Sequence, residues 1–158
     1  MRHAAGVSYS TSDARKSLLG EVAASIEALA RAFALFGVAY ELVDEAMGDR
    51  LEEQLYGPTQ KAYAALRRTH AAYAARYALE PRSFEPPDPS GGRADAREVI
   101  DRAVEALEQA DAILVEIQDS GLGVEAGDRE SRAAVSDVRR QIDPLPARAE
   151  TLLSLLGR

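Results

Sequence analysis

The sequence predicts an all-α protein, a four-helix bundle of antiparallel, kinked helices that is expected to pair as a homodimer. A heptad repeat of apolar residues runs through residues 22–47, and three later segments show the same spacing. Steps that alternate between three and four residues return side chains to one side only in an α-helix. The stretches between these segments hold prolines and glycines, which favour reversals of the chain. The repeat consists of Val22, Ile26, Leu29, Phe33, Phe36, Tyr40, Val43 and Met47.

The composition indicates one folded domain. The chain has 158 residues, of which 46% are hydrophobic and 28% charged, as in ordinary globular domains. Alanine supplies much of the apolar fraction, which favours closely packed helices over a bulky aromatic core. We expect a flexible N-terminal tail at residues 1–12 and a single helical-bundle domain at residues 13–158.

The charge and the missing cysteines narrow the range of partners. A net charge of −7 makes this an acidic protein and disfavours binding to nucleic acid or to anionic lipid. Without cysteine the chain has no disulfide, thiolate zinc site, iron–sulfur cluster or thiol nucleophile. The start of the chain lacks the apolar core of a signal peptide, and the longest apolar run, residues 32–40, is shorter than the ~20 residues of a membrane span. We expect a soluble cytoplasmic protein with no nucleic-acid or membrane partner.

The first two helices are predicted at residues 13–47 and 58–79. Side-chain oxygens at residues 10–13 can cap the start of the first helix, and Gly48 suits its end. The pair Gly57-Pro58 is the stronger break, because proline removes a backbone donor and disfavours helix at the residue before it. One face of the second helix holds Tyr63, Leu66, His70, Tyr73 and Tyr77.

The second half of the chain predicts a loop and two more helices. Residues 80–92 contain four prolines and two glycines, which exclude regular structure, and Phe84 is the only large apolar side chain that could hold this loop in place. A third helix is predicted at residues 94–119. Asp128 can cap a fourth helix, and Asp143, next to a proline, predicts a kink or restart within it.

The outer side of the first helix predicts an interface. At about 100° per residue, Leu35, Val38 and Leu42 fall opposite the heptad repeat, so this helix is apolar almost all round. A helix that is apolar on every side is normally buried on every side. We interpret this second face as the contact with another subunit in a two-fold dimer, or with another helical protein. In the alternative, the kinked ends of the second and fourth helices, or the loop at residues 80–92, cover it within one chain.

Tyr63, His70, Tyr73 and Tyr77 share one face of the second helix and form the candidate ligand-binding set. Hydroxyl groups and an imidazole in a helix seam need partners, because an unsatisfied buried polar group costs about 1–3 kcal/mol. A small-molecule pocket in which His70 titrates or polarises a bound group would supply them. A polar layer that fixes the helix register is the alternative, and it is favoured because nothing beside His70 has a catalytic character.

Acidic pairs at three-residue spacing are the third feature. Such spacing puts two carboxylates on one side of a helix, where they can hold Mg²⁺ or Mn²⁺. Glu41/Asp44 with Glu98/Asp101 superficially resemble the paired acidic motifs of all-α nucleoside-triphosphate pyrophosphohydrolases, although the first pair of that family is Glu-x-x-Glu. The acidic residues of the third helix lie opposite its apolar side, as a solvated face does, so Glu41 and Asp44 are the only weak metal candidates. The pattern Glu-x-x-Asp occurs at Glu41/Asp44, Glu98/Asp101, Glu108/Asp111, Glu116/Asp119 and Glu125/Asp128.

Other chemistry has little support in the sequence. Di-iron bundles need Glu-x-x-His pairs, and neither His3 nor His70 has a glutamate three residues before it. The glycine-rich stretch at residues 121–128 resembles a phosphate-binding loop, but it follows a helix rather than a strand and is interpreted as structural. We expect no cofactor, no catalytic residue and no metal.

The predicted function is therefore that of a non-enzymatic interaction or assembly module that self-associates through the outer face of its first helix. A small-molecule-binding bundle around His70 is the alternative. A divalent-metal-dependent nucleotide hydrolase that uses Glu41 and Asp44 is the third hypothesis. The sequence leaves open the partner, the ligand, the exact oligomeric state and the order of residues 80–92.

Overall fold

The structure, a computed structural model, describes residues 2–89 and 93–157, with side chains from Thr11 onward. The described residues form helices and connecting segments without a strand, which confirms the all-α prediction. In chain order the helices are α1 (Arg2–Leu42), α2 (Glu45–Leu51), the π-helical turn η1 (Glu52–Tyr56), α3 (Gly57–Arg76), α4 (Ala96–Asp119), α5 (Leu122–Glu125), α6 (Arg129–Ile142) and α7 (Leu145–Leu156).

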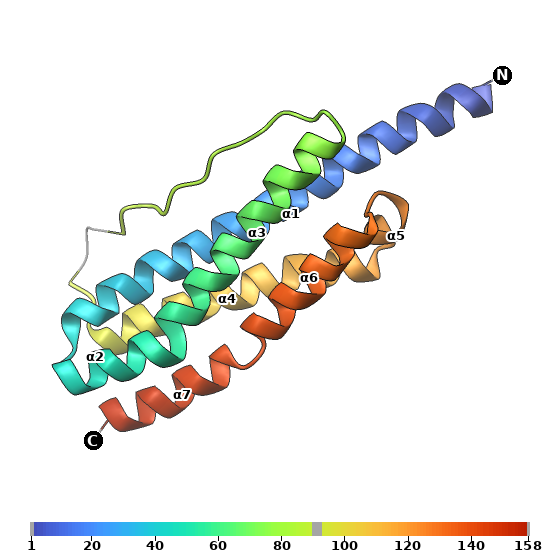
Figure 1. Ribbon diagram of the computed structural model, residues 1–158. Helices are drawn as coiled ribbons and strands as arrows, with labels where there is room; N and C mark the ends of the chain where they lie inside the picture. The colour runs from blue at the N-terminus through green and yellow to red at the C-terminus, as the bar shows by residue number, and fades with distance from the viewer. Residues whose placement is uncertain (1, 90–92, 158) are drawn as a thin grey trace.

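The long helices lie side by side in an elongated molecule (Figure 1). α1 packs against α3 and α4, while α6 packs on α3 and α7 packs on α4. Figure 1 shows that α3 and α4 run in the same direction and that α1 and the pair α6–α7 run opposite to them. This arrangement arises because the segment between α3 and α4 crosses the length of the molecule before α4 begins.

The first helix begins and ends at different residues from those predicted. α1 begins at Arg2, although its start was expected near residue 13 after a flexible tail at residues 1–12. Alanines at the start of the chain favour helix, and capping oxygens do not prevent a helix from continuing past them. α1 ends at Leu42, and Asp44 caps α2 by accepting a hydrogen bond from the Met47 backbone N–H at 2.8 Å. The predicted end near Gly48 is therefore wrong, since Gly48 lies buried inside α2.

The predicted break at Gly57-Pro58 is a π-helical turn instead. The chain remains helical from Glu45 to Arg76, and the Gly57 N–H bonds to the Glu52 carbonyl five residues earlier. Pro58 has no N–H to give to the Gln54 carbonyl, and Arg148 of α7 donates to that oxygen at 3.3 Å. A single extra residue in the turn thus accommodates the proline, as π-bulges do elsewhere.

The segment between α3 and α4 forms a strap along the outside of the molecule (Figure 1). It contains the predicted loop at residues 80–92, of which residues 90–92 lie outside the described residues. Phe84 is half-buried against the core, and Arg82 forms an ion pair with Glu27 of α1. Residues 79–89 have no regular structure, as predicted for this part of the loop, and Phe84 contacts the core.

The second half of the chain follows the prediction closely. The α4 side chains predicted to face inward are buried, and Asp95 and Asp128 cap α4 and α6. The break between α6 and α7 lies at the predicted proline, but Asp143 does not cap α7, because Pro144 is the first flanking residue and no side-chain bond is made. The buried α4 residues are Ile100, Ala103, Leu107, Ala110, Leu114 and Ile117.

α1 is the most apolar helix. By length and composition, Thr11–Leu42 could cross a membrane. This was not expected from the sequence, because the longest unbroken apolar run covers only residues 32–40. Core helices of soluble proteins and signal sequences meet the same criterion. α1 packs against α3 and α4, and about half of its most apolar stretch is buried inside the structure. The buried Ser25 hydroxyl donates to the Ala110 carbonyl of α4 at 2.9 Å, which ties the two helices together.

Two glycines give a paired test of backbone packing. A Cβ atom at Gly127 would lie 2.2 Å from the Gly123 carbonyl oxygen, whereas one at Gly20 would meet nothing within 4 Å. We expect Gly127→Ala to lower the free energy of unfolding by about 1–3 kcal/mol through overpacking. Gly20→Ala, in an exposed helical position, should raise it by roughly 0.5–1 kcal/mol. Urea unfolding of both variants measures the difference, and equal effects would contradict the close approach at Gly127.

Candidate functional site

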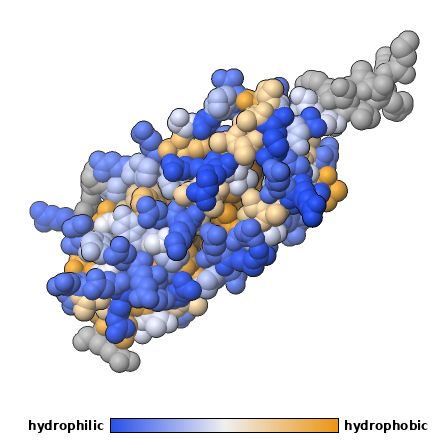
Figure 2. Space-filling model, in the orientation of Figure 1, coloured by the Kyte–Doolittle hydropathy of each residue, from blue (hydrophilic) through white to orange (hydrophobic). Residues whose placement is uncertain are grey.

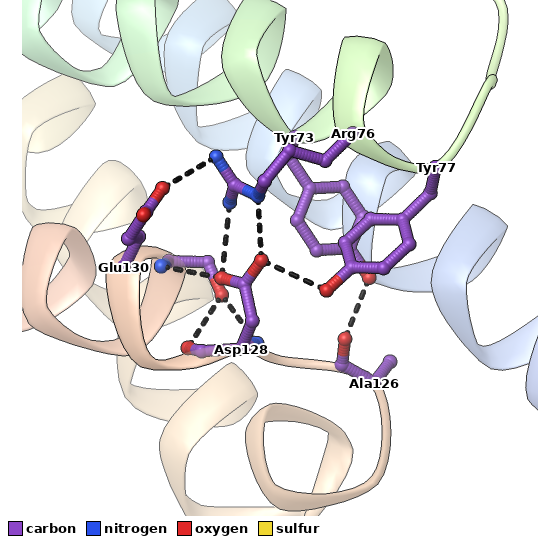
Figure 3. Close-up of polar contacts among 7 residues, drawn as sticks. Tyr73, Arg76, Tyr77, Ala126, Asp128 and Glu130 are labelled. Atoms are coloured by element: carbon purple, nitrogen blue, oxygen red, sulfur yellow. Dashed lines mark hydrogen bonds and ion pairs between the residues drawn. The ribbon is translucent and has the colours of Figure 1, made fainter.

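A polar cluster joins the end of α3 to the segment before α6 (Figure 3). Arg76 donates two hydrogen bonds to Asp128, from Nε to Oδ2 at 2.7 Å and from Nη2 to Oδ1 at 3.0 Å, and pairs with Glu130 at 2.8 Å. The Tyr77 hydroxyl donates to Asp128 Oδ2 at 2.9 Å, and the Tyr73 hydroxyl donates to the Ala126 carbonyl at 2.6 Å. These contacts tie the end of α3 to the start of α6, and we call the cluster of Tyr73, Arg76, Tyr77, Ala126, Asp128 and Glu130 the clamp.

Asp128 is the centre of the clamp. It also caps α6, since it accepts a bond from the Ser131 N–H at 2.8 Å while its own N–H donates to the Ser131 hydroxyl at 3.0 Å. Burial alone would raise the pKa of Asp128, but hydrogen bonds from Arg76 and Ser131 outweigh it and hold the pKa well below its usual range. Burial, and then the neighbouring Tyr77, raise the pKa of Tyr73 to about 12. Tyr73 is therefore a neutral donor at physiological pH.

His70 lies in a different environment, beneath the strap. Its side chain is buried, and Nδ1 has no hydrogen-bond partner in the described part of the chain. The edge of the ring meets Phe84, with 5.0 Å between ring centres. Burial and then the positive charge of Arg82 lower the pKa of His70, so the ring is neutral near pH 7. A groove of about 370 Å³ opens beside it, lined by Lys16, Leu19, Gly20, Ala23 and Leu79–Arg82.

Tyr63 lies in a third environment, an aromatic cluster between α1 and α3. Its ring stacks on Phe33 at 6.0 Å between ring centres, and the Arg67 guanidinium lies 4.6 Å from the ring centre. Phe33 also contacts Tyr56 at 4.9 Å, and Gly37 leaves room for the Tyr56 hydroxyl, which would lie 3.2 Å from a Cβ atom there. The buried Tyr63 hydroxyl has no partner among the described residues.

The structure thus divides the four predicted ligand-binding residues among three environments. Tyr63 is in the aromatic cluster, His70 lies beneath the strap, and Tyr73 and Tyr77 belong to the clamp, with 4.7 Å between their ring centres. The spacing in the sequence correctly placed the four side chains on one side of the helix, but it could not show what each one contacts. Along its length, α3 contacts α1, the strap and α6. The pair whose polar atoms still lack partners is Tyr63 and His70.

The predicted interface residues differ in exposure. Leu35 and Val38 are half-buried and pack against the core, while Leu42 is 49% exposed. Tyr40, 37% exposed, is close to Leu42 in sequence. The face of the molecule in Figure 2 is mainly hydrophilic, with apolar side chains in small areas between charged ones. Part of the predicted interface is therefore covered within one chain, and the part that stays exposed is Leu42, at the C-terminal end of α1.

The acidic residues lie in solvent. Glu41 and Asp44 are both exposed, and Asp44 is engaged as the cap of α2. The acidic side chains of the third predicted helix, now α4, are exposed as well, at Glu98, Asp101, Glu105, Glu108, Glu116 and Asp119. Among residues 11–89 and 93–157, no three acidic or histidine side chains are grouped so that they could hold a metal ion. The arrangement offers no grouped ligands for the metal of the hydrolase hypothesis.

A further pocket lies where sequence reasoning saw only a structural loop. It is bounded by α1, the end of α4, α5 and the start of α6, and has a volume of about 230 Å³. The glycine-rich stretch at residues 121–128 forms one wall. The apolar residues Leu122 and Val124 within that stretch were the feature of the sequence that could have drawn attention to it. Only the tertiary structure shows that Val124 stays 76% exposed.

Comparison with known proteins adds no relative. No protein-family model matches the chain, and neither the curated proteins nor the solved structures contain a significant match.

The clamp predicts a specific dependence of stability on pH. Because the folded-state pKa of Asp128 is depressed, its contribution is complete above the ordinary carboxyl pKa of about 3.9 and is lost as the pH falls through the lower folded-state value. We expect Asp128→Asn to lower the free energy of unfolding by about 1–3 kcal/mol at pH 7, because charge-assisted bonds to Arg76 disappear. The difference from wild type should shrink as the pH falls below 4.

Asp137→Asn serves as the matched control for this measurement. Asp137 lies on the same helix and pairs with Arg140, but both side chains are exposed, so its loss should change stability by less than about 1 kcal/mol. Urea unfolding between pH 2.5 and 7 compares the two variants. A pH-independent deficit in Asp128→Asn would show that the carboxylate charge is not what the clamp uses.

The contacts of the strap with His70 predict how the pKa of this histidine responds to mutation. Because burial depresses the folded-state pKa of His70, this histidine stabilises the fold fully above pH ~6.5, and its contribution declines as the pH falls below that value. Phe84→Ala should admit water to the ring and raise the pKa toward 6.5. Arg82→Gln should raise it less, since burial is the larger cause. Imidazole chemical shifts followed by NMR measure all three values, and an unchanged pKa in Phe84→Ala would contradict this account.

Proposed function

We propose that this chain is a four-helix bundle that acts as a non-enzymatic assembly module and pairs with a second copy through the C-terminal end of α1. The observation that carries the proposal is the apolar side chain of Leu42, which is 49% exposed at the C-terminal end of α1. Leu35 and Val38 continue this surface toward the core. A two-fold contact here would place the same side chains opposite one another and remove them from water.

The surroundings of this surface set the strength of pairing. Glu41, Asp44 and Glu45 are exposed around it, so two copies would bring like charges together. Salt screens such charges over about 10 Å at 0.1 M ionic strength. The exposed apolar area is small compared with a standard interface. We therefore infer a weak, reversible dimer that becomes stronger as the salt concentration rises.

Leu42→Glu tests the interface. A charge at this position should raise the dimer dissociation constant by about tenfold or more, because the apolar contact is replaced by a buried carboxylate. Sedimentation velocity and native mass spectrometry measure the dimer, and circular dichroism checks the fold. Val124→Glu is the matched control, since Val124 is exposed but lies at α5. A monomeric wild type at all salt concentrations, or equal dimerisation of Leu42→Glu, would rule the proposal out.

A small-molecule binding module is the second candidate function. It is supported by the buried, unpartnered Nδ1 of His70 beside the groove under the strap. In the neutral ring one nitrogen donates and the other accepts, so a ligand group of the opposite kind to Nδ1, a donor for one tautomer and an acceptor for the other, would satisfy it. Screening a fragment set by melting temperature, with His70→Gln as the comparison, tests this function. A fragment whose shift is equal in both proteins would not be bound by His70.

A further inference from the structure

The pocket beside α5 has apolar walls contributed by three helices. Leu18 and Val22 of α1, Ile117 of α4 and Val135 of α6 face the same space, and each is nearly fully buried. The opening is bordered by Val124, which is 76% exposed. The pocket is open to solvent on one side, where Gln118, Ser131, Arg132 and Ser136 also line it. For scale, a closed cavity of about 150 Å³ with apolar walls accepts benzene. This pocket, at about 230 Å³, has room for an apolar body of roughly nine or ten heavy atoms.

The wall formed by the α5 segment is fixed in place. Gly127 lies against the backbone of Gly123, and Gly121 adopts a positive φ of 83° that lets the chain turn after α4. The clamp holds the other end of the segment through Ala126 and Asp128 (Figure 3). A wall held in this way needs little reordering when a ligand enters, which favours binding.

The polar groups around the opening differ in whether they are satisfied. Gln118 Nε2 donates to the Ser136 hydroxyl at 3.3 Å, and Gln118 Oε1 accepts from Arg139 at 2.8 Å. Arg132 is the only charged side chain that lines this pocket, and its guanidinium has no hydrogen-bond or ion-pair partner in the described part of the chain. An unpaired guanidinium at the opening of an apolar pocket complements a ligand with an apolar tail and a carboxylate.

We propose that the α5 pocket binds a medium-chain carboxylic acid, with its hydrocarbon tail between α1, α4 and α6 and its carboxylate at Arg132. The volume fits a chain of about eight carbons. The charge at the opening selects a carboxylate over an alcohol of the same length. This site is independent of the pairing surface, because Leu42 and Tyr40 do not line the pocket.

Octanoate is the probe, and 1-octanol is its neutral counterpart. Titration of full-length protein, followed by methyl NMR, should shift the resonances of Leu18, Val22, Ile117 and Val135 with a single dissociation constant. Octanoate should bind more tightly than 1-octanol to the wild type. Arg132→Gln should weaken octanoate binding by about fivefold or more and leave 1-octanol binding unchanged, an effect kept modest because the guanidinium is exposed to solvent.

Arg129→Gln is the matched control, because Arg129 is an exposed arginine on the same helix that does not line the pocket. It should bind octanoate as wild type does. The proposal is overturned if octanoate shifts methyl groups elsewhere, if octanoate and 1-octanol bind equally, or if Arg132→Gln and Arg129→Gln lose affinity to the same extent. Since the charge change is on the surface, both variants are expected to fold, and circular dichroism verifies this.

Discussion

Close packing of α1 against α4 is the constraint on which the rest of the structure depends. Both helices carry fully buried alanines, among them Ala28 and Ala32 of α1 and Ala103 and Ala110 of α4, and the Ala110 carbonyl accepts a hydrogen bond from Ser25 of α1. Small side chains let helix backbones approach closely, so larger residues such as Leu29 and Leu107 can interdigitate around them. α3, the pair α6–α7 and the strap then cover the remaining sides. The packing against α3 and α4 accounts for the buried part of the apolar surface of α1, while Leu42 at its C-terminal end stays exposed.

The polar groups are distributed unevenly over this core. At the α5 end the clamp satisfies Tyr73, Tyr77 and Asp128 completely, and this fixes the start of α6 to the end of α3. Along the middle of α3, His70 and Tyr63 are buried with atoms that have no partner. Native structures contain few such atoms, and each unsatisfied group lowers stability unless a ligand or water meets it. The clamp is therefore structural, whereas the unpartnered polar atoms of His70 and Tyr63 are the places where a ligand or water could form a hydrogen bond.

Individual elements show why sequence reasoning succeeded or failed. The α4 seam was predictable because its apolar positions are separated by charged ones, which gives a single unambiguous face. The break at Asp44 was missed because the heptad repeat continues to Met47, and a cap three residues earlier interrupts the helix without interrupting the pattern. The predicted break at Gly57-Pro58 is a π-helical turn, and the carbonyl that Pro58 leaves free accepts from Arg148, which is distant in sequence. Rules for helix ends consider only hydrogen-bond donors nearby in the sequence, whereas this donor lies in α7.

The sequence by itself determined the helical class, the inward face of α4 and the cap at Asp128, because each depends on residues within a few turns of one another. The tertiary structure decided which neighbours each face meets. It divided the α3 residues Tyr63, His70, Tyr73 and Tyr77 among three surroundings, covered much of α1, and formed the α5 pocket with its unpaired Arg132. Helical periodicity fixes the direction of a side chain around its own axis, whereas burial and hydrogen bonding depend on contacts between residues far apart in the chain.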